Sequence, residues 1–423
     1  MSEERNSNSW LPDAMVVRNF QLYVSGAALL RGVGFFLIPI YTRYIIPSEY
    51  GKLEMINTFT STIEIVFTLG LFQVFFMEFF KYEGRDRKEL IDRILSAYLL
   101  LTTILYLIGG LSVLFFHDLF HPDISVTLIL LAISGSYLNF FQNCFIAFLR
   151  MNERAGLLTV VQVAFGILAI CMNILMVVVW NSGIKGIVVA NLITVSLTGL
   201  LALYSYRKNL GALRLYITKK DLKHILSLGI MFVPGAIAFW LMNSLSRWML
   251  LNFSGLHEVG IYSVAVKFSS IFDPLVVQPF LSAYSTRTLK GFSEGKFEQK
   301  LGKLIPMAIG FFLLVGWIMS NLAVLVVDPS YKDAARLILP LIIGVGFGLV
   351  ANIANLVIIF HRKIHLGFLS ILTGLLVSLL FNYLLVPYYG GIGAAWGTLL
   401  GNMVWMSMVL VFHLWEMRKR SSL

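Results

Sequence analysis

Twelve long apolar runs divide this sequence, and they limit what the chain can fold into more than any other feature. Each run is long enough to cross the ~30 Å hydrocarbon core of a bilayer as a helix. The runs lie near residues 19–46, 53–78, 94–116, 125–149, 156–180, 186–206, 225–253, 259–284, 304–327, 334–360, 366–386 and 392–415. Charged residues are 13% of the chain, against ~25% in soluble domains. The sequence therefore predicts an all-α integral membrane protein with twelve transmembrane helices.

Lysine and arginine are distributed very unequally among the segments that connect these runs. With a cytoplasmic N-terminus, the inward-facing segments hold 25 of them and the outward loops hold four. Because basic loops stay on the cytoplasmic side, both termini are predicted to be cytoplasmic. The net charge of +11 is thus a topology signal, so membrane lipids are expected partners and nucleic acid is not.

An offset of 209 residues relates the two halves of the chain. Identical residues coincide at Glu49 and Glu258, Gly51 and Gly260, Gly135 and Gly344, Asn143 and Asn352, and Asn173 and Asn382. Six spans per half make the repeats parallel, with a site expected between them near the midplane. The predicted segments are a cytoplasmic N-terminus 1–18, a six-helix bundle 19–206, a basic cytoplasmic linker 207–224, a second bundle 225–415 and a cytoplasmic tail 416–423.

Two carboxylates occupy equivalent deep positions in the second span of each half. Glu64 is roughly 16 Å and Asp273 roughly 21 Å into its span at ~1.5 Å per residue, too deep for a short acid to reach either surface. A charge at the centre of a span costs ~2.5–3.5 kcal/mol on insertion scales. Two interpretations stay open. Each acid either fixes helix packing, or serves a wet cavity as a counter-ion or as the site of a coupling ion, H⁺ or Na⁺. No other cofactor is expected.

Four basic residues also fall inside spans. Arg31 is near mid-depth, where its guanidinium is expected to face a cavity. Arg247 and Lys267 lie six to eight residues from the outer ends of their spans, so either snorkelling or a cavity explains them. Arg43 is close to the outer interface, which favours snorkelling. If the leading spans of both halves face each other, they enclose a central cationic cavity suited to an anion such as phosphate.

Four segments resemble the signatures of one family. They are "IPIYTRYIIPSEYGKLEMINTF" at 38–59, "LHEVGIYSVAVKF" at 256–268, "PSYKDAARLILPLI" at 329–342 and "FNYLLVPYYGGIGAAWGT" at 381–398. Together with twelve spans in two halves, they resemble the polysaccharide-transport branch of the multidrug/oligosaccharidyl-lipid/polysaccharide (MOP) flippase superfamily. That branch includes the Wzx-type flippases of O-antigen and lipopolysaccharide synthesis.

The resemblance implies a flippase rather than an enzyme. Its substrate would be an undecaprenyl-diphosphate-linked oligosaccharide, moved from the cytoplasmic to the outer leaflet of a bacterial or archaeal plasma or inner membrane by alternating access. Arg31, Arg247, Lys267 and Arg43 would bind the diphosphate and sugar head. Polysaccharide polymerase and assembly proteins would be further partners.

Three alternatives were weighed against a flippase. A multidrug exporter of the same superfamily would want an acid-dominated cavity for organic cations, whereas the predicted cavity is mainly basic. A membrane glycosyltransferase, polymerase or ligase usually needs a sizeable outer loop with catalytic groups, and every predicted outer loop here is about ten residues or fewer. A structural scaffold would leave the deep charges unexplained.

Overall fold

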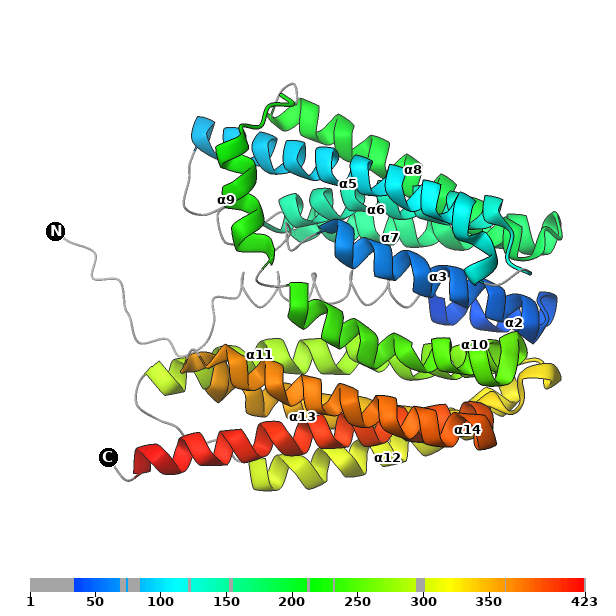
Figure 1. The fold of residues 1–423 in the computed structure, drawn as a ribbon, viewed down its shortest axis with the longest axis vertical. Helices are drawn as coiled ribbons and strands as arrows, with labels where there is room; N and C mark the ends of the chain where they lie inside the picture. The colour runs from blue at the N-terminus through cyan, green and yellow to red at the C-terminus, as the bar shows by residue number, and fades with distance from the viewer. Residues whose placement is uncertain are drawn as a thin grey trace.

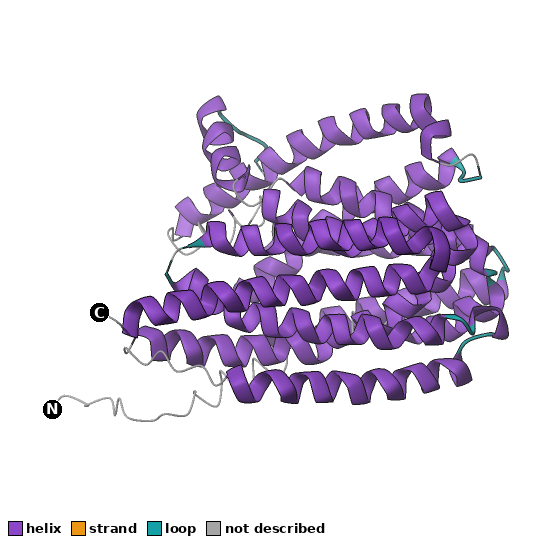
Figure 2. Cartoon of the chain, turned by 60° about the horizontal axis from the view of Figure 1, so that its bottom comes forward, coloured by secondary structure: helices purple, strands orange, loops and turns teal. Residues whose placement is uncertain are grey.

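The computed structural model describes residues 34–68, 74, 84–120, 123–151, 155–210, 214–230, 233–293, 301–361 and 363–421, and every regular element in them is helical (Figure 2). The elements of residues 34–210 are α2 (Ile38–Tyr44), α3 (Pro47–Thr68), α5 (Gly84–Phe120), α6 (Val126–Met151), α7 (Ala155–Ile174), η1 (Leu175–Val179) and α8 (Gly183–Leu210). Those of residues 219–421 are α9 (Lys219–Gly229), α10 (Val233–Ser270), η3 (Asp273–Val277), α11 (Gln278–Ser293), α12 (Leu301–Val326), η4 (Pro329–Tyr331), α13 (Ala334–Phe360) and α14 (Ile364–Ser421). The predicted all-α fold is confirmed.

The helices form two groups that lie side by side (Figure 1). We call residues 34–210 the first half and residues 233–421 the second half. The halves meet mainly where α3 packs on α10. Two long elements, α10 and α14, turn back on themselves at Gly255 and Gly390, so each supplies two of the predicted spans. The end of the bundle at which they turn is called the Gly255 end below.

Lipid is the solvent that the outer surface of the bundle requires. Seven helices within the described residues are long and apolar enough to cross a membrane. Their outward faces carry large apolar side chains, and Trp317 and Leu325 on α12 are 63% and 82% exposed. Apolar surface on this scale is stable against acyl chains and not against water. The chain is thus a multi-pass membrane protein.

Helix α3 begins earlier than the hydropathy pattern predicts. The predicted loop 47–52 forms its first turns, starting at Pro47. Proline suits the first turn of a helix, where its fixed φ is favourable and its missing N–H has no partner to lose. The early start places Glu54 about two turns inside the helix rather than at its edge.

The backbone obeys the 209-residue offset at positions of unusual geometry. Asn181 has φ of 47° and its equivalent Gly390 has φ of 51°, a left-handed conformation that non-glycine residues rarely adopt. Asn173 and its equivalent Asn382 each donate to the carbonyl four residues before, at 2.8 Å. The two halves therefore share one local geometry at the start of their last helices.

The same offset relates two halves of a close contact between α3 and α10. A Cβ atom on Gly51 would lie 2.0 Å from the Leu256 carbonyl oxygen, and one on Gly260 would lie 2.0 Å from the Pro47 carbonyl oxygen. The contact is reciprocal, because Pro47 and Gly51 are the equivalents of Leu256 and Gly260. Glycine at both positions lets α3 and α10 touch backbone to backbone near the Gly255 end.

A second contact closes the same end. The Tyr331 hydroxyl donates to the Ile45 carbonyl oxygen at 2.8 Å, and the Asp328 backbone N–H donates to Thr42 Oγ1 at 3.4 Å. Tyr331 and Asp328 belong to the second half, whereas Ile45 and Thr42 belong to the first. Polar bonds and glycine packing thus hold the halves together at this end.

The segment between the halves contains a short helix that is fixed to the first half. Thr218 and Asp221 form a capping box at the start of α9, which satisfies backbone N–H groups that a helix start leaves open. Hydrogen bonds from Thr218 keep the pKa of Asp221 below its ordinary value. The Asp221 carboxylate also binds the Arg93 guanidinium on α5, at 3.2 Å. The start of α9 is therefore held against α5.

We expect Gly51→Ala and Gly260→Ala each to lower the stability of the folded protein by ~1–3 kcal/mol, the usual cost of overpacking. The reason is that each methyl group would meet a backbone carbonyl that cannot move aside. Thermal unfolding in detergent measures the loss. Gly135→Ala on α6 is the control, because a Cβ there meets nothing within 4 Å. Equal melting temperatures for all three variants would contradict the contact.

Candidate functional site between the two halves

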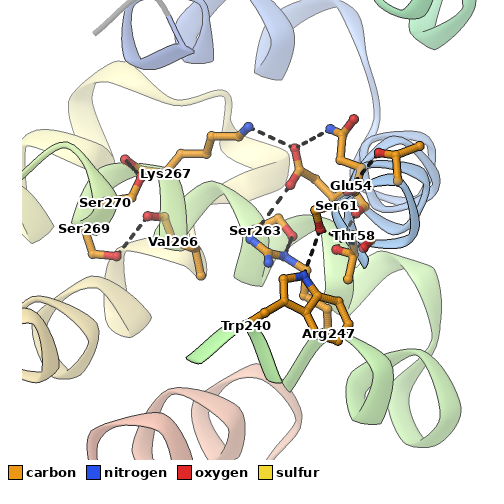
Figure 3. Close-up of polar contacts among 12 residues, drawn as sticks. Glu54, Thr58, Ser61, Trp240, Arg247, Ser263, Val266, Lys267, Ser269 and Ser270 are labelled. Carbon is orange, nitrogen blue, oxygen red and sulfur yellow. Dashed lines mark hydrogen bonds and ion pairs between the residues drawn. The ribbon is translucent and has the colours of Figure 1, made fainter. Parts of the chain in front are cut away.

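One buried carboxylate on α3 binds two cations on α10 (Figure 3). Glu54 Oε1 lies 3.1 Å from Lys267 Nζ, and Glu54 Oε2 lies 3.9 Å from Arg247 Nη2. The Glu54 side chain is 5% exposed. Because α3 and α10 belong to different halves, this cluster bridges them within the membrane. We call Glu54, Arg247 and Lys267 the interface charge cluster.

Neutral polar groups complete the cluster. Arg247 Nε donates to Ser263 Oγ at 3.2 Å, and Asn57 Nδ2 donates to Glu54 Oε1 at 3.4 Å. Trp240 on α10 donates from its indole nitrogen to Ser61 Oγ on α3 at 2.9 Å (Figure 3). These bonds fix the side chains and add a second polar bridge between the halves.

The interface charge cluster carries a net positive charge. Two basic side chains share one carboxylate, so the formal charges of these groups sum to +1. Lys267 is the more accessible, since its side chain is 34% exposed against 13% for Arg247. An ammonium group has three donors and gives one to Glu54, so Lys267 can also bind an anion that approaches from the exposed side.

The acids predicted at mid-depth lie apart from this cluster, one in each half. Glu64 Oε1 accepts from Asn139 Nδ2 at 3.4 Å, which ties α3 to α6. Asp273 is the first residue of η3, where Pro274 interrupts the regular helix. Its carboxylate accepts from Gln278 Nε2 at 3.3 Å.

The remaining predicted residues are Arg31 and Arg43. Arg31 lies outside the described residues. Arg43 is exposed in the last turn of α2, as snorkelling would place it. The pKa of Asp328, in the loop before η4, lies below its ordinary value because the Ser330 backbone N–H donates to it and, to a lesser degree, because Arg43 and Lys332 are near.

A cavity of about 770 Å³ lies within the second half. Such a volume is in the ~300–1,000 Å³ range of small-molecule sites. Its lining comes from α10, η3, α11, α13 and α14, and the residues are Phe239, Met242, Asn243, Tyr262, Val266, Ser269, Ser270, Asp273, Pro274, Val277, Gln278, Pro279, Ser282, Leu341, Gly344, Val345, Gly348, Leu349, Asn352, Thr398, Asn402 and Trp405. Among the described residues of this lining, Asp273 is the one that carries a charge. We call this space the second-half cavity.

The sequence interpretation missed Glu54 and Ser263. Glu54 was placed at the edge of a span, because the predicted span began at residue 53 and the true helix begins at Pro47. The repeat contained a signal, because Glu54 is equivalent to Ser263 at the 209-residue offset and this position is therefore polar in both halves. The basic residues were identified, but the acid that binds them was not.

The fold is that of the MOP superfamily of transporters and flippases. An inward-facing structure of a multidrug resistance MATE family transporter of this superfamily matches with a TM-score of 0.69 at 18% identity, over 95% of both chains. The lipid II flippase MurJ, in an inward closed conformation, matches with 0.68 at 14% identity, over 94% of this chain and 86% of that one. A MOP superfamily transporter from Pyrococcus furiosus matches with 0.63 at 17% identity, over 96% of both.

Sequence comparison narrows the class further. Residues 16–285 match the model of the polysaccharide biosynthesis protein family, which is more than half of the 423 residues. The chain therefore belongs to the polysaccharide biosynthesis protein family. No curated relative matches the sequence. The link to polysaccharide biosynthesis expected from the motifs is confirmed by this family, and the fold is one shared with structures of the MOP superfamily.

We expect Glu54→Gln to lower the stability of the folded protein by roughly 3 kcal/mol, the lower end of the cost of breaking a buried ion pair. Lys267 and Arg247 would then face each other without a counter-charge. Thermal unfolding in detergent measures the loss.

Glu49→Gln is the matched control, since the Glu49–Lys52 pair is 39% and 21% exposed and is worth ~1 kcal/mol or less. The double variant Glu54→Gln/Lys267→Gln should recover part of the stability. A double variant no more stable than Glu54→Gln alone would argue against the ion pair.

Proposed function

We propose that this protein is a flippase that moves an undecaprenyl-diphosphate-linked oligosaccharide from the cytoplasmic to the outer leaflet by alternating access. The product would feed synthesis of a cell-surface polysaccharide. Membership in the polysaccharide biosynthesis protein family and the fold shared with MurJ support this class of substrate. The finer assignment, a Wzx-type flippase of O-antigen or a similar repeat unit, rests on the sequence motifs.

The observation that carries the proposal is the net positive charge of the interface charge cluster. A diphosphate group is a strong acceptor for ammonium and guanidinium donors. Lys267 Nζ is held 3.1 Å from Glu54 and remains one-third exposed, so a phosphate oxygen can take a place beside it. A site for an organic cation would need the opposite balance of charge.

Substrate binding and opening of the Gly255 end would then be coupled. The Glu54–Lys267 pair joins the halves, so separation of α3 from α10 at this point must break it. A bound diphosphate competes with Glu54 for the same ammonium group and so reduces the cost of breaking the bridge. A ligand shifts a conformational equilibrium only through such a difference in its affinity for the two states.

The membrane potential and bound ions would supply the free energy for transport. With a negative interior, outward movement of a charge gains ~2.3 kcal/mol per elementary charge per 100 mV, so a diphosphate is driven outward. Glu64 and Asp273 would bind H⁺ or Na⁺ during the return step. Each acid accepts a hydrogen bond from its own half, so an ion bound to either acid would act on that half.

We expect Lys267→Gln to reduce transport at least tenfold, with Lys267→Arg keeping most of it, because the arginine preserves the charge. The assay uses proteoliposomes with labelled undecaprenyl diphosphate N-acetylglucosamine, and a membrane-impermeant lectin reports its arrival outside. Lys332→Gln, on an exposed loop, is the control and should transport normally. Full transport by Lys267→Gln would exclude the proposed anion site.

The ion-coupling roles predict that Glu64→Gln and Asp273→Asn weaken the response of transport to imposed H⁺ or Na⁺ gradients. Each change removes a charge while keeping the size of the side chain. The measurement compares initial rates with and without each gradient in the same vesicles. An unchanged response in both variants would remove these acids from coupling.

A further inference from the structure

The second-half cavity carries its polar side chains at positions that differ from those of its counterpart in the first half. The 209-residue offset pairs the cavity residues Tyr262, Thr398 and Asn402 with Leu53, Val189 and Ile193, whereas the cavity residues Val345 and Trp405 correspond to Ser136 and Ser196. The arrangement of polar groups around this cavity is therefore specific to the second half.

The side chain beside the acid also differs between the halves. In the first half Asn139 lies beside Glu64 and donates to it. The equivalent of Asn139 is Gly348, which lines the cavity together with Asp273, the equivalent of Glu64. A Cβ on Gly348 would meet only Trp405 at 3.6 Å and Asn402 Oδ1 at 4.0 Å. The second half thus has a glycine that borders the cavity at the position where the first half has an amide beside its acid.

The lining of the cavity presents many hydrogen-bond acceptors. Asn243, Asn352 and Asn402 each donate their amide N–H to the carbonyl four residues before, at 2.7, 2.8 and 2.9 Å. A carbonyl only accepts, so the NH₂ group must face it, and the carboxamide oxygen is left to accept from another donor. The Asp273 carboxylate adds an anionic acceptor. The complementary ligand is rich in hydroxyl or N–H donors.

We propose that the second-half cavity binds the glycan of the lipid-linked substrate, as an uncharged polyhydroxylated sugar, while the diphosphate stays at the interface charge cluster. This inference rests on the proposed function and adds the place and the chemistry of sugar recognition. Hydroxyl groups would donate to the carboxamide oxygens and to Asp273, and Trp405 and Phe239 offer apolar faces for the sugar ring. Ser269 and Ser282 supply further hydroxyls in the lining.

Other parts of the substrate fit this cavity poorly. The diphosphate would meet the Asp273 carboxylate, and the described residues of the lining include no lysine or arginine. The polyprenyl tail would bury amides and hydroxyls against hydrocarbon, which costs free energy for each polar group left without a partner. The tail has a better environment in the lipid that surrounds the bundle.

The test compares two probes on the purified full-length protein, bare undecaprenyl diphosphate and undecaprenyl diphosphate N-acetylglucosamine. We expect the wild-type protein to bind the glycosylated probe at least tenfold more tightly. Gly348→Asn, which restores the first-half amide and fills the cavity, should abolish that preference without changing the affinity for the bare probe. Asn402→Leu, which keeps the size and removes the acceptor, should do the same.

Three controls separate the possible outcomes. Gly135→Asn, on the first-half helix α6 in open space, should keep the preference, and melting temperatures confirm that each variant folds. Lys267→Gln should lower the affinity for both probes. Unchanged affinity in this variant would count against the proposed function alone. Equal affinity of the wild-type protein for the two probes would overturn the glycan site. The glycan site would also be overturned if Gly348→Asn and Asn402→Leu lost Na⁺ binding, measured by calorimetry, and kept the sugar preference.

Discussion

Close backbone contact between α3 and α10 is the constraint on which the rest of the site depends. Gly51 and Gly260 let the two helices touch, and a side chain at either position would push them apart. Glu54 is one turn beyond Gly51, and Lys267 is two turns beyond Gly260. The two glycines carry no side chain that would hold the helices apart. The helices therefore come close enough for the ion pair at 3.1 Å to form.

A symmetric backbone here carries asymmetric chemistry. At the 209-residue offset Glu54 is equivalent to Ser263, and Lys267 is equivalent to Thr58. At these four positions each half contributes one charged and one hydroxyl residue, and the charges have opposite sign; Arg247 adds a second cation from the second half. Two like charges at equivalent positions would repel across the interface. Because Ser263 replaces a second acid and Thr58 replaces a second lysine, the halves can bind each other through one pair of opposite charges.

The sequence predicted the membrane class, the repeat and the basic residues, because each depends on local composition or spacing. Long apolar runs identified α12 and α13 directly. Arg247 and Lys267 were singled out by the cost of burying a charge. Their partner Glu54 was missed because hydropathy averages over a window and moved the start of α3 from Pro47 to residue 53. The second-half cavity was not predicted, since it depends on side chains from distant segments packing around Gly348.

The two proposed sites differ in how they would behave during a transport cycle. The interface charge cluster is built from both halves, so any opening at the Gly255 end must change it. The described residues that line the second-half cavity come from α10 to α14, so this lining can move with its half as one body. A glycan held there would stay bound while the diphosphate contact forms and breaks. The sugar would then set which substrate enters, and the charge cluster would set when the halves separate.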